Sequence, residues 1–145
     1  MKITILDAKP EEEEEVIIKC HEINDDLKAL ILKLRQGNAK IAGFGEDGIH
    51  FLVPDEIFYF DTVDQRVFAY CEKEVYEVKE KLYELEQMLS ARNFMRSSKS
   101  HIVNLEKIKS VSPAFGGRFE AVLLNAEKII ISRQYVPVLK ERLGL

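Results

Sequence analysis

The sequence has little of what marks a membrane-spanning, secreted or metal-binding protein. It has two cysteines, Cys20 and Cys71, far apart and outside any motif, and three histidines at no metal-ligand spacing. The cysteines therefore predict free, reduced thiols in a cytosol rather than a disulfide framework. The longest unbroken apolar run is five residues, 67–71, whereas a membrane span needs about 18. No basic and apolar leader opens the chain, so we expect no secretion and a cytoplasmic location.

Three sequence patterns typical of enzymes are misplaced, incomplete or absent. Residues 43–48 fit the letters G-x-G-x-x-G, but a strand is expected after them where a phosphate site needs a helix, and Glu46 and Asp47 would repel phosphate. We therefore predict a hairpin turn there. His21 and Glu22 lack the second histidine of a zinc protease motif, and no G-x-S-x-G nucleophile elbow is present. The sequence predicts no enzyme, no cofactor and no metal.

Charge is distributed unevenly along the 145 residues. The net charge is −4, with 46% hydrophobic and 32% charged residues, as in one globular domain with a short extension. Residues 1–90 hold 11 Lys/Arg and 21 Asp/Glu, whereas residues 91–145 hold 10 and 4. This asymmetry indicates a basic functional end that can neutralise phosphates, and an acidic remainder that disfavours indiscriminate adhesion to DNA. The alternative is that the charges only solvate two faces.

The first 38 residues predict a small ββα extension. Apolar and β-branched residues at 2–6 and 16–20 predict two paired strands, with five glutamates at 11–15 between them. Asn24 is expected to cap a helix that Gly37 ends. The helix has one apolar stripe, formed by Leu27, Leu30, Ile31 and Leu34. We expect this stripe to be buried, either on the small sheet of the extension or in a dimer interface.

From residue 40 onward the pattern changes to short strands, which predicts a mainly β (α+β) fold. We expect strands at 40–44, 49–53, 57–62, 67–71, 75–78, 102–103, 109–115, 119–124 and 128–131, with a hairpin turn at 116–118. Residues 80–89 predict a helix, and Ser132 can cap a last helix that reaches Leu143. Pro137 is best tolerated in a first turn, so this helix can start late and leave 132–135 as a loop.

Residues 94–105 combine cations, small hydroxyls and an imidazole between apolar anchors. Hydroxyls and cations reach phosphate oxygens, and Lys or Arg also reaches guanine O6 and N7 in a major groove. The candidates for phosphate contacts are Arg96, Ser98, Ser100 and His101. The alternative for each is hydrogen bonding at a strand end or solvation. Asn104 is expected to cap the turn at 105–108, and the core is expected to include Phe94, Ile102, Val103 and Tyr135. Lys107, Lys109 and Arg118 either extend the basic face or only solvate it.

This segment, together with residues 131–135 (Ile-Ser-Arg-Gln-Tyr), resembles the LytTR family of bacterial DNA-binding domains. Residues 55–60 (Asp-Glu-Ile-Phe-Tyr-Phe) are similar to its acidic–Ile–aromatic strand, and residues 82–86 to its helix. The blocks agree in order and spacing over about residues 40–143. The resemblance implies antiparallel β-sheets with peripheral helices at 39–145, and leaves residues 1–38 as an extension that packs on this domain or completes a dimer.

The resemblance further implies a sequence-specific transcription regulator whose loops enter successive major grooves of double-stranded DNA, as a homodimer on repeated half-sites. It implies base contacts from Lys99, from Arg133 and from the loop between 62 and 67, where Gln65 and Arg66 are alternatives. Lys99 stands where arginine is common in the family, and a lysine is a point charge without the guanidinium fork.

A phosphate-receiving domain needs about a hundred residues or more, and about 38 precede the LytTR-like part, so we expect a standalone member of the family. Similar standalone members often act with a small membrane protein that restrains them. The alternative function is a protein-interaction module that regulates another transcription factor without binding DNA itself. The acidic N-terminal half and the amphipathic helix with Leu27 and Leu34 would serve that role.

Overall fold

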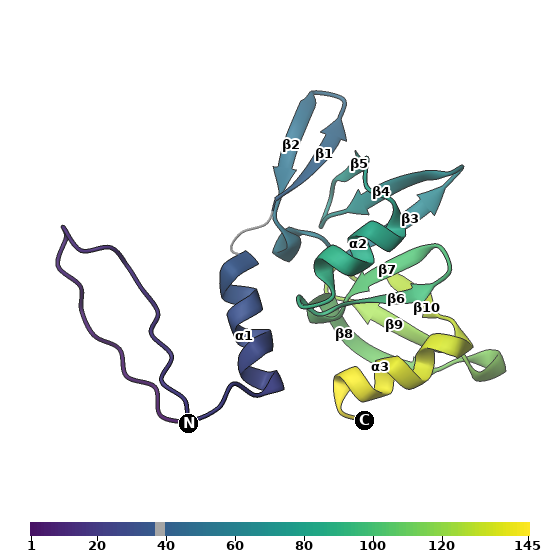
Figure 1. Ribbon diagram of the computed structural model, residues 1–145. Coiled ribbons are helices and arrows are strands. Elements are labelled where there is room, and N and C mark those ends of the chain that lie inside the picture. The colour runs from purple at the N-terminus through teal and green to yellow at the C-terminus, as the bar shows by residue number, and fades with distance from the viewer. Residues whose placement is uncertain (37–39) are drawn as a thin grey trace.

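The computed structural model describes residues 1–36 and 40–145, in which ten strands form two antiparallel sheets (Figure 1). The large sheet has the order β2-β1-β5-β4-β3-β7-β6, and the small sheet has the order β10-β9-β8. The large sheet consists of β1 (Ile41–Gly45), β2 (Gly48–Leu52), β3 (Tyr59–Val63), β4 (Arg66–Tyr70), β5 (Val75–Val78), β6 (Phe94–Ser98) and β7 (His101–Asn104). The small sheet consists of β8 (Ile108–Pro113), β9 (Phe119–Leu123) and β10 (Lys128–Ile131). The predicted mainly β, antiparallel fold is confirmed.

Helices lie at the periphery of the sheets, as predicted. The α-helices are α1 (Asp25–Gln36), α2 (Leu82–Leu89) and α3 (Val136–Leu143), and the 3-10 turns are η1 (Pro54–Glu56), η2 (Leu105–Lys107), η3 (Phe115–Gly117) and η4 (Arg133–Tyr135). None of the described helices combines the length and the apolar character that crossing a membrane requires.

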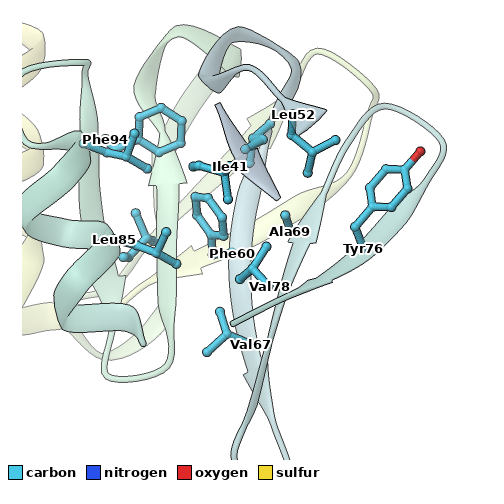
Figure 2. Packing of buried hydrophobic residues seen from close by; sticks show 12 residues of the cluster. Ile41, Leu52, Phe60, Val67, Ala69, Tyr76, Val78, Leu85 and Phe94 are labelled. Carbon is cyan, nitrogen blue, oxygen red and sulfur yellow. The ribbon is translucent and has the colours of Figure 1, made fainter. Parts of the chain in front are cut away.

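Strands β3, β7 and β6 are buried on both faces, because successive side chains of a strand point to opposite sides. One face packs against α2 through a cluster that includes Phe60, Ile102, Phe94, Leu85 and Leu89. Figure 2 shows part of this cluster, with Leu85 of α2 beside Phe60 of β3. The other face packs against the small sheet and α3 through a second cluster that includes Phe58, Val103, Met95, Leu123, Ile131 and Leu139. These three strands are therefore the middle layer of the domain.

The G-x-G-x-x-G segment is a hairpin turn, as predicted. Gly45 and Gly48 pair at the end of β1 and β2, and a strand follows in place of a helix. Gly43 is required by packing, since a Cβ there would lie 2.8 Å from Cδ1 of Leu52 and 2.8 Å from Cβ of Tyr76. The glycines of this motif thus allow close approach of strands and do not form a phosphate site.

The ββ part of the predicted N-terminal ββα extension is wrong. Residues 1–24 contain no strand, and they run out and back as an extended segment away from the sheets (Figure 1, purple). The backbone here is joined across a turn, where the Glu12 N–H donates to the Lys9 carbonyl at 2.9 Å. The two arms are extended as expected, but they do not form the ladder of hydrogen bonds that defines a sheet.

Helix α1 is present with its predicted cap, since Oδ1 of Asn24 accepts from the Leu27 N–H at 2.9 Å. Burial of its apolar stripe on a small sheet of the extension is wrong, whereas burial in a dimer interface stays a prediction. Leu27 is 8% exposed, but Leu30 and Leu34 are 41% and 48% exposed, because the small sheet expected to cover them does not form. The predicted helix end at Gly37 and the domain boundary at 38/39 lie outside the described residues.

Strand β6 was not predicted, because its polar residues Arg96, Ser97 and Ser98 interrupt the alternation of apolar and polar residues that indicates a strand. Ser97 is fully buried and pairs through its backbone, as described below. Ser132 was also expected to cap the last helix, but its side chain makes no capping hydrogen bond. The late start of that helix is confirmed, since η4 precedes α3 and Pro137 lies in the first turn of α3.

Asn104 is buried and ties three segments together. Its Oδ1 accepts from the Glu106 N–H at 3.0 Å, which confirms the predicted cap of the turn that follows β7. Its Nδ2 donates to the carbonyl of Ile57 at 2.9 Å, just before β3. Both ends of the amide are therefore satisfied in a site that is 1% exposed.

Asn104→Ala should lower the free energy of unfolding by about 2–3 kcal/mol, because it leaves the buried Ile57 carbonyl and the partly buried Glu106 N–H without their partners. Asn125→Ala is the matched control, since its Oδ1 makes a similar bond to the Glu127 N–H at 3.1 Å on the surface. The control should lose less than about 1 kcal/mol. Equal losses in urea titrations of the two variants would contradict this account of Asn104.

Candidate nucleic-acid interface

The turns β3–β4, β6–β7 and β8–β9 point to the same side of the molecule, on the right of Figure 1. We call the surface formed by these turns and η4 the loop edge. Its parts are joined by backbone hydrogen bonds. The Thr62 N–H donates to the Ser100 carbonyl at 3.0 Å, and the Ser132 N–H donates to the Ser97 carbonyl at 2.8 Å. The loop edge is therefore one connected surface, although its segments are far apart in the sequence.

Lys99 and Arg133 line the same depression of the loop edge. Its lining residues are Ser98, Lys99, Ser100, Gly116, Arg118, Ser132, Arg133 and Gln134. The lining includes three cations and no carboxylate, and Lys99, Arg118 and Arg133 are all exposed. The structure thus brings together two residues that the sequence singled out separately, and adds Arg118, which the sequence left as an alternative.

Arg96 stabilises the β6–β7 turn that carries Lys99. Nη1 of Arg96 donates to the Lys99 carbonyl at 2.7 Å, and its Nε donates to Oε2 of Glu86 on α2 at 2.8 Å. The Arg96 side chain is only 19% exposed. Its guanidinium therefore links the turn to the helix, whereas the side chain of Lys99 lies exposed at the tip.

The hydroxyls of this turn are grouped around His101. Oγ of Ser98 and Oγ of Ser100 lie 3.0 and 3.1 Å from its Nδ1, and Nε2 lies 3.2 Å from Oδ1 of Asp61 on β3. Since an ionised carboxylate only accepts, the geometry places a proton on Nε2 and lets Nδ1 accept from a serine hydroxyl. The imidazole thereby orients the two hydroxyls at the rim of the depression.

Arg66 and Gln65 differ in how they are held at the β3–β4 turn. Nε and Nη2 of Arg66 donate to both carboxylate oxygens of Glu77 on β5, at 2.7–3.3 Å. These hydrogen bonds raise the pKa of Arg66 and hold the pKa of the Glu77 carboxyl below its usual value. Gln65 is exposed at the tip and has a φ of 64°, beside Asp64 with a φ of 50°. Both residues carry a Cβ, unlike glycine, so their left-handed backbone is strained. Such strain is often kept at functional sites.

The β8–β9 turn packs directly on Arg133. A Cβ at Gly117 would lie 2.9 Å from Cδ and 3.1 Å from Cγ of Arg133, and Gly117 has a φ of +77°. The aliphatic part of Arg133 therefore rests on the backbone of η3. The sequence marked Gly117 only as a hairpin residue, because no local pattern could show which distant side chain would need this space.

Away from the loop edge, the remaining candidate chemistry is sparse. Both cysteines are free, and burial raises the pKa of the Cys71 thiol to about 11. Within residues 1–36 and 40–145, no group of three or more His, Cys, Asp and Glu side chains is arranged to hold a metal ion. A groove on the other end of the large sheet has apolar and mostly acidic lining, including Phe51, Leu124, Asp55, Glu56, Glu72 and Glu74, together with Lys73 and Lys107.

Comparison with known proteins agrees with this geometry. A model of the LytTr DNA-binding domain matches residues 47–144. The chain is 33% identical to the sensory transduction protein LytT of Enterococcus faecalis over 70% of its own length and 42% of that protein's. It is 27% identical to an uncharacterised HTH-type transcriptional regulator of Staphylococcus aureus (strain NCTC 8325 / PS 47), over 100% of this chain and 99% of that protein. It is also similar to the LytTr DNA-binding domain of a methyl-accepting/DNA response regulator from Bacillus cereus. That likeness has a TM-score of 0.70 at 25% identity and covers 75% of this chain and all of that domain.

Replacing Gln65 by glycine should raise the free energy of unfolding by about 0.5–1 kcal/mol. The variant relieves a left-handed residue, which costs about 1–2 kcal/mol, and loses roughly 0.5–1 kcal/mol to the greater freedom of the unfolded glycine. Gln87→Gly on the exposed face of α2 is the matched control and should be destabilising by a similar amount. Thermal unfolding of both variants tests the sign, and a Gln65→Gly variant that melts below the wild type would refute the strain.

Proposed function

The chain belongs to the LytTR family of DNA-binding domains, and we propose that it is a sequence-specific regulator of transcription that reads duplex DNA through the loop edge. The observation that carries this proposal is the shared depression of Lys99, Arg118 and Arg133, which holds three cations and no carboxylate. A major groove about 12 Å wide admits more than a helix, so turns at the edge of a sheet can reach base edges. A regulator of this kind acts in the cytoplasm, where its DNA is.

Within this proposal, Arg133 and Lys99 contact bases and Gln65 supplies the third contact. An arginine fork suits guanine O6 and N7, and a glutamine amide suits adenine N6 and N7. Gln65 is preferred to Arg66 because Nε and Nη2 of Arg66 already donate to the carboxylate of Glu77. Ser98 and Ser100 contact phosphate through hydroxyls that His101 orients, and Arg96 supports the turn that presents Lys99.

Lys99→Ala and Arg133→Ala should each weaken binding to the preferred duplex by about 1–3 kcal/mol and relax the choice of base at one position. Lys73→Ala is the control, because Lys73 is an exposed cation that lines the acidic groove at the other end of the sheet. Duplexes are first selected from a random library with the wild-type protein, and the variants are then titrated at several salt concentrations. Unchanged base preference in both variants would count against the loop edge as the reading surface.

We also propose that residues 1–36 hold two copies together on repeated half-sites. These residues expose large apolar side chains by 41–89%, at Ile3, Ile5, Leu6, Val16, Ile17, Leu30, Leu32 and Leu34. Extended backbone without strand partners is a template for pairing with a second chain. The Staphylococcus aureus relative matches this chain over 100% of its length, extension included. A segment of this size is comparable to the roughly 20–30 residues that each partner of a specific interface uses.

Ile5→Glu combined with Ile17→Glu should shift the protein from dimer to monomer in sedimentation velocity, because two charges would enter the apolar interface. Binding to a duplex with two half-sites should weaken at least about tenfold, while binding to one half-site stays unchanged. Ile49→Glu is the control, since Ile49 is an exposed isoleucine on β2, outside the extension. A wild-type protein that sediments as a monomer at the concentrations that occupy DNA would end this part of the proposal.

A second candidate function is a protein-interaction module that regulates another transcription factor. The observation that favours it is the groove of apolar and acidic side chains at the end of the sheet opposite the loop edge. Affinity for DNA without sequence preference, together with capture of one defined protein partner, would support this alternative. The family resemblance also supports a proposed partner for either candidate function, a small membrane protein that restrains the regulator.

A further inference from the structure

Phe115 is an aromatic side chain with almost no protein around it. It is 93% exposed at the start of η3, more than the other exposed aromatic side chains of the described residues, Phe51 at 67% and Tyr83 at 57%. A single exposed apolar side chain is ordinary on a protein surface. The case for a role of Phe115 therefore depends on how its turn is built and on what lies beside it.

The turn that carries Phe115 is closed by its own backbone. The Ala114 N–H donates to the Arg118 carbonyl at 2.8 Å, and Pro113 pairs with Phe119 where the two strands meet. Gly116 and Gly117 follow Phe115 with φ of +76° and +77°, a conformation that other residues rarely adopt. The two glycines thus let the chain turn sharply after Phe115 and hold that residue at the tip.

The same turn forms one wall of the basic depression. Gly116 and Arg118 line it together with Lys99 and Arg133. The aliphatic part of the Arg133 side chain lies against Gly117, two residues after Phe115. The backbone of this turn therefore fixes Phe115 relative to Arg133. A ligand that reaches this guanidinium is therefore next to the turn that presents Phe115.

We propose that Phe115 is a further DNA-contacting residue, whose ring packs on thymine methyl groups beside the base that Arg133 reads. This inference rests on the proposed function. Lys99 and Arg133 of the depression are the proposed base contacts, and the apolar group that base edges offer in a major groove is the thymine C5-methyl. The ring therefore adds a preference for thymine next to the position of Arg133.

Phe115→Ala is tested on the duplex that the wild-type protein selects, with Phe51→Ala as the matched control on β2. We expect Phe115→Ala to weaken binding about tenfold, as burial of an aromatic side chain predicts. The dependence on salt should stay unchanged, because an apolar contact releases no counterion. Phe51→Ala should bind as the wild type does. Unchanged melting temperatures of both variants would show that the fold is intact.

The thymine assignment is tested with a duplex in which deoxyuridine replaces the thymines next to the Arg133 position, which removes only the methyl groups. The wild type should then bind as weakly as Phe115→Ala, and the variant should lose no more than twofold further. If Phe115→Ala binds each duplex about tenfold more weakly than the wild type binds the same duplex, the thymine contact is overturned. If Phe115→Ala binds the thymine duplex within twofold of the wild type, a role for Phe115 is overturned. A wild type that selects no sequence would instead overturn the proposed function itself.

Discussion

The hydrogen bond from the Ser132 N–H to the Ser97 carbonyl, 2.8 Å long, determines where the two main cations of the loop edge lie. It joins β6, at the edge of the large sheet, to the segment that leaves the small sheet. Lys99 follows Ser97 by two residues and Arg133 follows Ser132 by one, so their separation is governed by backbone geometry rather than by flexible loops. Ser97 is fully buried at this junction, where the two layers meet. Rigid strands, ending in short turns, thus hold groups that must match the spacing of a groove.

Of the four described non-glycine residues with positive φ, Asp64 and Gln65 lie at this edge, and Asn93 and Ala126 lie elsewhere. Asp64 and Gln65 in the β3–β4 turn, and Gly116 and Gly117 in the β8–β9 turn, all have positive φ. Sharp turns keep the exposed residues close to the ends of their strands, and the strand layers buried on both faces resist relaxation of the strain. The opposite end of the molecule differs in character, because the extension at residues 1–24 exposes apolar side chains and has no sheet to hold it. The proposed reading surface and the proposed association surface therefore lie at separate ends.

The total charge of a segment is a poor guide to the charge that a ligand meets. Residues 91–145 carry 10 cations, but several of them have partners within the protein. Arg96 bonds Glu86, Lys107 lies 5.1 Å from the ring of Phe58, and Lys140 lies 5.3 Å from that of Phe119. In the acidic half, Arg66 is likewise paired with Glu77. The basic surface that a duplex would meet is thus narrower than the sequence suggests, and centres on Lys99, Arg118 and Arg133.

The sequence by itself determined the mainly β fold, the hairpins, α2, the cap at Asn24 and the turn at Asn104, because these follow from local periodicity and turn chemistry. The antiparallel arrangement was implied by the family resemblance. The sequence also predicted Lys99 and Arg133 as DNA contacts, through a resemblance spread over several blocks. Only the tertiary structure decided that the two share a depression, that Arg66 is paired with Glu77 and that Gly117 supports Arg133, since these contacts join segments with no local pattern in common. It also showed that the expected N-terminal strands do not pair and that β6 exists. Strand pairing depends on a partner elsewhere in the chain or in another chain, and a local pattern of side chains cannot supply that partner.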